Sequence, residues 1–260
     1  MVVLPSNKIN QTIKQYIMKK IALLSVLFLL TINSHAQFWG NNTIKGNGEV
    51  TTVTRTTSNY DGVKCAGSFN FILVSGNEGN ITIEGESNLI EHIITEVKNN
   101  QLIIKPENGM NLRPSRKYTI TVTIPVEGIS EVSLAGSGKL WNEQILTSNE
   151  LSVQLAGSGD MNLSLANKMT TAKIAGSGNL NLSGNTTDLK LDLSGSGRLN
   201  AYELIANNVE ASVAGSGDVR INCQDNLKAK VAGSGDIVYK GNPKTENTNV
   251  AGSGSIKKAN

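Results

Sequence analysis

One tetrapeptide, repeated seven times at a nearly constant interval, dominates this sequence. It reads Ala-Gly-Ser-Gly, and once Ser-Gly-Ser-Gly, and successive copies lie 21, 19, 19, 20, 18 and 19 residues apart. Self-similarity at a fixed period is the signature of a repeat architecture, in which each unit buries its apolar surface against its neighbours. The first glycines of the copies are Gly136, Gly157, Gly176, Gly195, Gly215, Gly233 and Gly252.

The residues around each copy alternate between apolar and polar. Positions two before and four after the first glycine are apolar in every repeat, and the position four before it is mostly a smaller apolar residue. Polar residues such as Ser133, Lys173 and Asp192 stand between them. A period of two indicates half-buried strands on both sides of a glycine corner. We therefore predict an all-β fold, a β-solenoid or β-helix-like stack of coils of about 19 residues with one Ala-Gly-Ser-Gly corner each.

The chemistry of the tetrapeptide predicts a role for each of its residues. The first glycine is expected to adopt a backbone conformation that a residue with a Cβ resists. The alanine is expected at a crowded inner corner, and the serine in a ladder of hydroxyls running from coil to coil. Segments 142–149 and 202–208 vary in length and are predicted to be return loops, where solenoids often carry their binding residues.

The region before the array, residues 45–128, is also rich in strand patterns, and we expect it to be continuous with the seven-repeat solenoid of residues 129–260. Cys65-Ala66-Gly67-Ser68-Phe69 resembles a degenerate corner. Segment 88–97 is predicted to be a short helix with Asn88 as its N-cap. Turn signals separate five predicted strands: Val50–Thr57, Phe69–Ser75, Ile81–Glu84, Gln101–Lys105 and Tyr118–Ile124.

The amino-terminal 36 residues have the pattern of a secretory signal peptide. Met18-Lys19-Lys20 is a short basic region, residues 21–32 form an apolar run, and Ser34-His35-Ala36 is a small-x-small cleavage site. The apolar run of 12 residues is short for a membrane span. We predict a signal peptide over residues 18–36, with Met18 as an alternative start and residues 1–17 upstream of it. The protein is then exported, to the periplasm, the cell surface or the medium.

Charge, cysteine and histidine content exclude several classes of function. Residues 1–36 contain four of the 24 basic residues and none of the 21 acidic ones, so the rest of the chain is close to neutral. A nearly neutral chain offers no basic face for nucleic acid. Cys65 and Cys223 are predicted to be free thiols, because coils stacked in order would hold them beyond disulfide reach. His92 is the one histidine after residue 36, so no zinc site is expected.

Aspartates follow three of the corners and are the candidate binding residues of the sequence. Asp160, Asp218 and Asp236 give a glycine-aspartate pattern like that of calcium-binding β-rolls, which carry it on both halves of each coil. Asp218 and Asp236 would be adjacent in the stack and are the candidates for calcium. The same column also holds Lys139 and Arg198, and mixed charges equally suit a solvated ladder. We predict no catalytic residue, no metal and no cofactor.

A β-helix can also carry a polysaccharide lyase or a glycosidase. Such chemistry needs paired carboxylates or an acidic cluster with a basic partner, and no acidic cluster recurs on the predicted strands. Trp141, Tyr202 and Tyr239 lie at different offsets within their repeats, so they predict no column of sugar platforms. The sequence favours a non-catalytic surface or adhesion-type protein with a surface ligand. A module that binds a glycan or an envelope component and a polysaccharide-degrading enzyme are the alternatives.

The chain resembles the family of auto-transporter adhesins with a head GIN domain, exported proteins of Bacteroidota-type bacteria. The resemblance covers residues 45–256 and rests on segments 69–73, 81–90, 100–104 and 118–125, the Gly-Ser-Gly array and Tyr239-Lys240-Gly241-Asn242-Pro243. It implies an all-β, β-helix-like fold and an exported location. It brings no catalytic residues to this chain.

Overall fold

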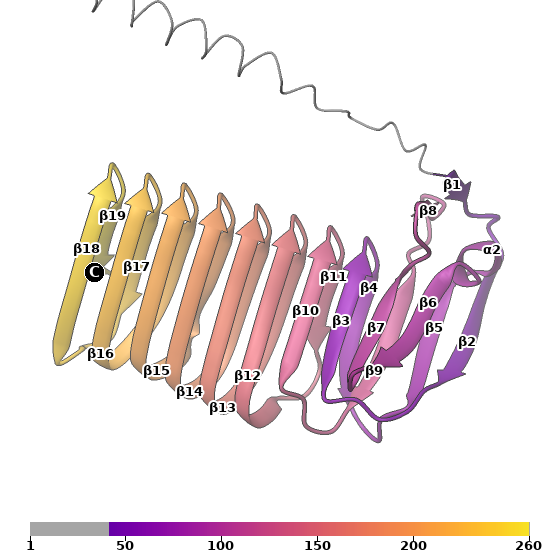
Figure 1. Cartoon of the computed structure of the whole chain (residues 1–260), viewed down its shortest axis with the longest axis horizontal. Helices are drawn as coiled ribbons and strands as arrows, with labels where there is room; N and C mark the ends of the chain where they lie inside the picture. The colour runs from indigo at the N-terminus through magenta and orange to yellow at the C-terminus, as the bar shows by residue number, and fades with distance from the viewer. Residues whose placement is uncertain (1–41, 260) are drawn as a thin grey trace, which may run out of the picture. The chain divides into compact units, whose positions relative to one another are not determined.

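The computed structural model describes residues 42–259, and most of them belong to strands. A 17-stranded sheet winds into a stack of parallel coils, and a two-stranded sheet accompanies its amino-terminal end. Figure 1 shows the coils side by side along the long axis of this part of the chain. No described helix is long and apolar enough to cross a membrane. The predicted signal peptide, residues 18–36, and residues 1–17 lie outside the described residues.

The seven repeats form the regular array, and each of its strands pairs in parallel with its equivalent one coil further on. The segments predicted to be return loops are strands in most coils, because the backbone ladder continues from one corner to the next. The predicted solenoid is therefore confirmed, with less loop than expected. The strands are β10 (Glu131–Gly136), β11 (Lys139–Asn142), β12 (Leu146–Gly157), β13 (Asp160–Gly176), β14 (Asn179–Gly195), β15 (Arg198–Gly215), β16 (Asp218–Gly233), β17 (Asp236–Lys240), β18 (Thr245–Gly252) and β19 (Ser255–Lys258).

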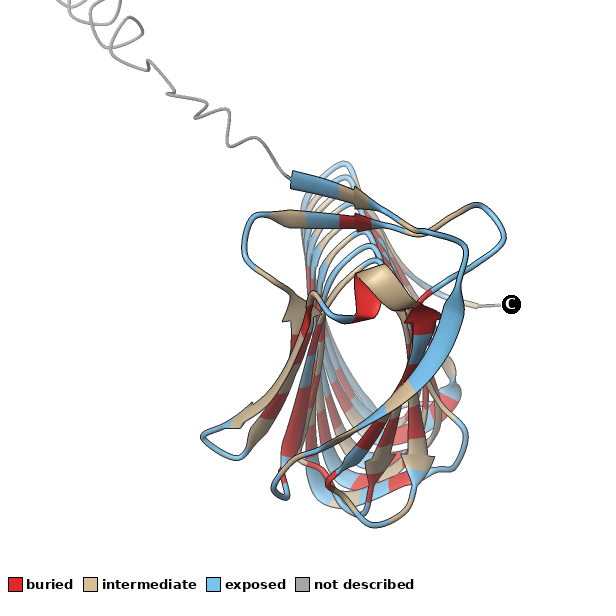
Figure 2. Ribbon diagram, turned by 90° about the vertical axis from the view of Figure 1, so that its right-hand side faces the viewer, coloured by how far each residue is buried: buried red, intermediate tan, exposed pale blue. Residues whose placement is uncertain are grey.

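Each coil contributes to two facing walls, which Figure 2 shows end-on. Strand β13, for example, leaves one corner, bends midway and runs to the next. We call residues 160–167 of β13 and their equivalents the exit wall, and residues 169–176 and their equivalents the approach wall. Alternate side chains of both walls point inward and fill the core; in β13 these include Met161, Leu163, Leu165, Ala172 and Ile174, all buried.

The backbone at the corner explains the first glycine of the motif. Its φ lies between +109° at Gly136 and +134° at Gly233, a region that L-residues rarely adopt. The carbonyl oxygen of Gly176 accepts hydrogen bonds from the backbone N–H groups of Ser196 and Gly197 in the next coil, both at 3.0 Å. A Cβ on Gly195 would lie 2.4 Å from that same oxygen. The expected role of the first glycine is confirmed.

An additional corner lies outside the regular array. Gly67 pairs with Gly136 and has a φ of +116°, so the degenerate motif at residues 65–69 is a true corner, as predicted. Its carbonyl oxygen accepts the N–H groups of Ser137 and Gly138. The column of corners therefore begins before the first perfect copy of the tetrapeptide.

Two expectations about the corner were wrong. The alanines, Ala156 and Ala175 among them, face solvent, because the residue before each alanine points inward and successive strand residues alternate. The buried small residue is the second glycine: a Cβ on Gly197 would lie 2.6 Å from the carbonyl oxygen of Gly178. The ladder between corners consists of backbone N–H groups; the serine side chains, such as that of Ser196, are exposed.

The region before the array extends the stack and then closes it. Strands β3 and β4 continue the columns of the array, placing Cys65 beneath Leu134 and Phe71 beneath Leu140. Strands β2, β5 and β6 pair antiparallel with their neighbours and complete this end. The predicted strands are confirmed to within a few residues at their ends. The strands are β1 (Asn42–Lys45), β2 (Val50–Thr56), β3 (Gly62–Gly67), β4 (Asn70–Ser75), β5 (Asn80–Glu86), β6 (Ile93–Lys98), β7 (Gln101–Pro106), β8 (Met110–Arg113) and β9 (Thr121–Val126).

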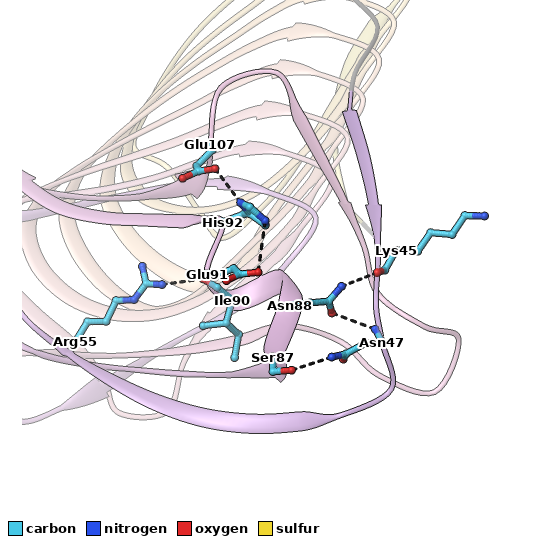
Figure 3. Close-up of polar contacts among 9 residues, drawn as sticks. All are labelled: Lys45, Asn47, Arg55, Ser87, Asn88, Ile90, Glu91, His92 and Glu107. Atoms are coloured by element: carbon cyan, nitrogen blue, oxygen red, sulfur yellow. Dashed lines mark hydrogen bonds and ion pairs between the residues drawn. The ribbon is translucent and has the colours of Figure 1, made fainter.

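The predicted helix over residues 88–97 is wrong in extent and in its cap. The helix α2 spans only Ser87–Ile90, its N-cap is Glu86, and the chain then enters β6. Isoleucines suit a strand better than a helix, and β6 finds a partner in β7. Asn88 instead joins α2 to the chain around β1 (Figure 3): its Nδ2 donates to the Lys45 carbonyl at 2.8 Å, and its Oδ1 accepts from the Asn47 N–H at 3.0 Å.

The buried carboxylate of Glu86 joins three segments of the amino-terminal end of the stack, which we call the cap. Glu86 is 1% exposed. Its Oε1 accepts from the Gly48 N–H and the Ser115 hydroxyl, both at 2.6 Å, and its Oε2 accepts from the Ser115 N–H at 2.8 Å. Burial alone would raise the pKa of Glu86, but these hydrogen bonds outweigh it and hold the pKa below its ordinary value.

The last coil carries polar residues at inward positions. Glu246 and Thr248 stand where the preceding coil has Leu227 and Ala229. The Tyr239 hydroxyl donates to Glu246 Oε2 at 2.9 Å, so this carboxylate lies over the end of the core. Polar terminal repeats and inward-pointing charges both discourage a further chain from adding to an open edge.

The two cysteines are buried, free thiols in different coils, as expected. Cys65 lies in β3 near the closed end, and Cys223 lies in β16 near the other. Burial raises the pKa of both thiols. Both side chains therefore act as apolar core residues.

Substitutions at the corners should reveal a gradient along the stack. We expect Gly195→Val to lower the free energy of unfolding by about 3 kcal/mol or more, because its side chain meets a carbonyl in a conformation that valine resists. Gly252→Val meets an equivalent oxygen at 2.2 Å but lies in the last coil, which can fray, so it should cost less than half as much. Ser196→Ala, the control, should change stability by less than about 0.5 kcal/mol. Urea denaturation measures all three: equal, negligible losses at the two glycines would contradict the assigned role of the corner, and equal large losses would contradict the gradient.

Stability should also depend on the ionisation of Glu86. Because its folded pKa is depressed, the carboxylate stabilises the fold above its unfolded pKa of about 4.3, and this contribution is lost as the pH falls through the folded value. Glu86→Gln should cost about 1–3 kcal/mol at neutral pH, since the amide cannot accept all three hydrogen bonds. The gap between wild type and variant in urea denaturation should narrow as the pH falls below about 4. A gap independent of pH would show that Glu86 does not act through its charge.

Candidate functional site

The exit wall presents two neighbouring columns of outward side chains, one residue from each coil. The columns run along the stack, at the strand spacing of about 4.8 Å. Their members are polar or charged with few exceptions. The first column consists of Lys139, Asp160, Asn179, Arg198, Asp218, Asp236 and Ser255, and the second of Trp141, Asn162, Asn181, Asn200, Arg220, Val238 and Lys257.

Two adjoining hollows lie over these columns, with volumes of about 640 and 630 Å³. They share the three asparagines of the second column, which stand between them, and we call the two hollows together the exit-wall trough. Both hollows border the row of Asn162, Asn181 and Asn200. The first hollow is further lined by Lys139, Asp160, Arg198, Asp218 and Arg220, and the second by Trp141, Ser164, Ser183 and Glu203.

Hydrogen bonds between coils fix the polar side chains of the trough. Asn181 Nδ2 donates to Asn162 Oδ1 at 2.7 Å, and the Ser164 and Ser183 hydroxyls lie 2.8 Å apart. Asparagine has two donors and two acceptor lone pairs, so these contacts leave hydrogen-bonding capacity on each amide. The trough therefore offers a row of three amides at a regular spacing, two of which are joined by a hydrogen bond.

A β-bulge places an aromatic side chain at the rim of the trough. The register of β15 against β14 shifts after Asn181, and Tyr202 and Glu203 are consecutive residues without an inward neighbour between them. Bulges of this kind re-aim side chains. The Arg220 guanidinium lies 5.8 Å from the centre of the Tyr202 ring, and Lys240 Nζ lies 5.3 Å from it. These cation–π contacts hold the ring beside the row of amides.

Two arginines of the trough form no ion pair with the neighbouring carboxylates. Arg198 and Arg220 line it, and neither forms an ion pair with any residue between 42 and 259. Lys240 pairs with Glu203 at 3.3 Å. On the approach wall, by contrast, Lys228 and Glu210 of adjacent coils pair at 2.6 Å. The two guanidiniums thus remain available to a ligand, with the planar donor geometry that suits a carboxylate.

The aspartates singled out in the sequence all lie in the first column of the exit wall. Asp160 accepts from Asn179 Nδ2 at 2.8 Å, and Asp218 is exposed in the trough. Asp236 Oδ1 accepts from the N–H and hydroxyl of Ser255, both at 2.7 Å, and these bonds lower its pKa. Within the described part of the chain no three His, Cys, Asp or Glu side chains come together as a metal cluster would require. Calcium binding at Asp218 and Asp236 stays a sequence-based hypothesis.

Sequence reasoning missed that Trp141 and Tyr202 share a wall. It compared their offsets from the corner glycine and found them different. The relevant signal is parity: Trp141 is five residues after Gly136 and Tyr202 is seven after Gly195, and odd offsets face outward on the exit wall. Tyr239 has an even offset of six from Gly233 and is buried.

A groove of about 640 Å³ on the approach wall has an apolar floor of Leu189, Val209 and Leu227, each no more than 3% exposed.

His92 lies beside α2, where its Nδ1 is 2.9 Å from Glu107 Oε2 and its Nε2 is 3.7 Å from Glu91 Oε1 (Figure 3). These contacts, together with that of Arg55 Nη2 to the Ile90 carbonyl at 2.7 Å, tie the cap together.

Comparison with known proteins gives one family and a set of solved structures. A sequence model of the family described as "Putative auto-transporter adhesin, head GIN domain" matches residues 59–243, more than half of the chain. The crystal structure of a putative adhesin from Bacteroides fragilis is 27% identical, with a TM-score of 0.77, and the match covers 83% of this chain and 100% of that one. No curated protein matches.

Two structures from Parabacteroides distasonis are also similar. One, described as a putative lipid binding protein, is 25% identical with a TM-score of 0.69, over 84% of this chain and 100% of that one. The other, a putative adhesin, is 21% identical with a TM-score of 0.67 over the same shares, a likeness of fold alone.

Proposed function

Because this chain belongs to the family described as putative auto-transporter adhesin, head GIN domain, we propose that it is an exported, non-catalytic protein of the adhesion type. In this proposal the solenoid is a rigid scaffold, and the exit-wall trough is its contact surface for a ligand outside the cytoplasm. The observation that carries the proposal is the regularly spaced row of amides between Trp141 and the guanidinium of Arg220, which forms no ion pair among residues 42–259. The backbone ladder sets the spacing of these residues, so a ligand need not order the backbone to meet them.

The carboxylates around the trough support binding better than catalysis. Polysaccharide hydrolysis requires two carboxyl groups that flank one bond and differ in protonation. Asp160 accepts a hydrogen bond from Asn179, and Glu203 forms an ion pair with Lys240. Their contacts run along the ladder from coil to coil, which is what stabilises a stack. An enzyme is therefore the weaker alternative.

Lipid binding is a second candidate, and one observation favours it. The approach-wall groove joins an apolar floor to a rim that includes Met169, a side chain 44% exposed. One of the similar structures is described as a putative lipid binding protein. The side chains of this floor are almost completely buried, however, so an acyl chain would cover little exposed apolar surface.

The adhesion proposal predicts where the protein is found and what its loss does. In a bacterium that carries the gene, antibodies against the solenoid should label intact cells, and mass spectrometry should find the chain beginning at Gln37. Deleting the gene should reduce attachment of the cells to a surface or to other cells, and the wild-type gene should restore it. A protein that keeps residues 1–36 and stays in the cytoplasmic fraction would overturn the proposal.

A further inference from the structure

We propose that the exit-wall trough binds a linear, carboxylate-bearing polysaccharide laid along the stack axis, across the strands. This inference rests on the proposed function and names the chemical class of its ligand. It follows from three features that succeed one another along the second column of the exit wall, which both hollows of the trough border: an aromatic side chain, a row of amides and a cationic end.

Trp141 supplies the aromatic end. It lies partly exposed in β11 and lines the trough beside Asn162 and Leu163. The C–H face of a pyranose ring is apolar and packs on the face of an indole, while its hydroxyls remain free to form hydrogen bonds. A partly exposed tryptophan at the end of a row of amides provides this combination of an apolar surface with polar neighbours.

The asparagines supply the middle of the trough. A pyranose carries hydroxyl groups that donate and accept hydrogen bonds, and side-chain amides do both as well. Asn162, Asn181 and Asn200 repeat at the strand spacing of about 4.8 Å, which is close to the length of one sugar unit in an extended chain. A polysaccharide lying along the stack therefore meets an equivalent amide at each successive sugar.

The cationic end decides in favour of an acidic polysaccharide. Arg198 and Arg220 lie on adjacent strands and line the trough without ion-pair partners among residues 42–259. Lys240 and Tyr202 complete this end, where the Arg220 guanidinium and Lys240 Nζ both lie over the Tyr202 ring. A guanidinium binds a carboxylate through two parallel hydrogen bonds, and a neutral sugar would leave that charge unused. Asp218 beside the two arginines limits the positive charge, so a ligand with spaced carboxylates fits better than a dense polyanion such as nucleic acid.

The stack also sets the length of the ligand. Trp141 and Arg220 lie four coils apart in one column, a separation of about 19 Å at the strand spacing. An oligosaccharide must span this distance to contact both ends. Affinity should therefore rise with chain length until both ends are reached and then level off at one ligand per protein.

The test is calorimetric titration of the full protein, in the presence of EDTA, with oligosaccharides of increasing length from three carboxylated polysaccharides: polygalacturonate, alginate and hyaluronan. At least one series should bind with a length plateau. Its affinity should fall as salt is added, because charge pairing contributes to it. When the ligand is oligogalacturonide, its methyl ester is the neutral match, and affinity should fall about tenfold or more, as expected for loss of a charged hydrogen-bonded pair.

Variants at both ends of the trough provide the structural check. Trp141→Ala and Arg220→Gln should each weaken binding about tenfold, and Arg220→Gln should also reduce the preference for the carboxylate over its ester. Met169→Ala and Lys190→Gln remove an exposed apolar and an exposed charged side chain from the approach wall, and both should bind as wild type does. Equal thermal unfolding of all variants will show that the fold is intact.

Several results would overturn this inference. They are failure of all three series to bind, binding that is unaffected by the exit-wall variants or weakened by the approach-wall controls, and equal binding of single-stranded DNA. If the protein is exported and supports attachment but fails this test, the polysaccharide assignment falls and the adhesion proposal stands. A cytoplasmic location would contradict the adhesion proposal even if the purified protein binds carboxylated sugars.

Discussion

The whole stack depends on one contact, in which the carbonyl oxygen of a corner glycine accepts one or two backbone N–H groups from the corner of the next coil. In the centre of the array the Gly176 oxygen receives Ser196 and Gly197 in this way. Any Cβ at position 195 would occupy the same space, so glycine is required on both steric and conformational grounds. Repetition of this contact holds the coils in register, and a register error of one residue would turn every core side chain toward solvent.

That register also makes the binding surface. Because equivalent residues of successive coils lie directly above one another, a polar residue at one outward offset becomes a column, and a column of amides becomes the row that both hollows of the exit-wall trough border. The side chains need no separate device to align them. The irregular element is the bulge in β15, which places Tyr202 and Glu203 outward in succession and gives the trough an end that differs from its middle.

The repeat alone predicted the fold class, the corner glycines and the additional corner at Gly67, because a strict period leaves few other ways to bury the alternating apolar residues. It did not predict the direction of the alanine column, although the alternation rule contained that information. Helix α2 was overestimated, because a short apolar run looks alike in a helix and in a strand and only the partner strand β7 decides between them. The trough was missed in part because offsets were compared by value instead of by parity. The pairing of Tyr202 with Arg220 and Lys240 needed the bulge, whose only trace in the sequence is one interval of 20 residues among several of 19.

The polar last coil has a bearing on how such a protein can change over generations. With Glu246 at one end of the core and the antiparallel cap at the other, both ends are specialised and the coils between them are interchangeable. Unequal recombination within the coding sequence can therefore add or remove a whole coil without exposing an edge or disturbing a cap. Where the coil gained or lost is one of the three that carry Asn162, Asn181 or Asn200, the row of amides changes by one step. The number of encoded repeats would then set the length of ligand that the exit wall can contact.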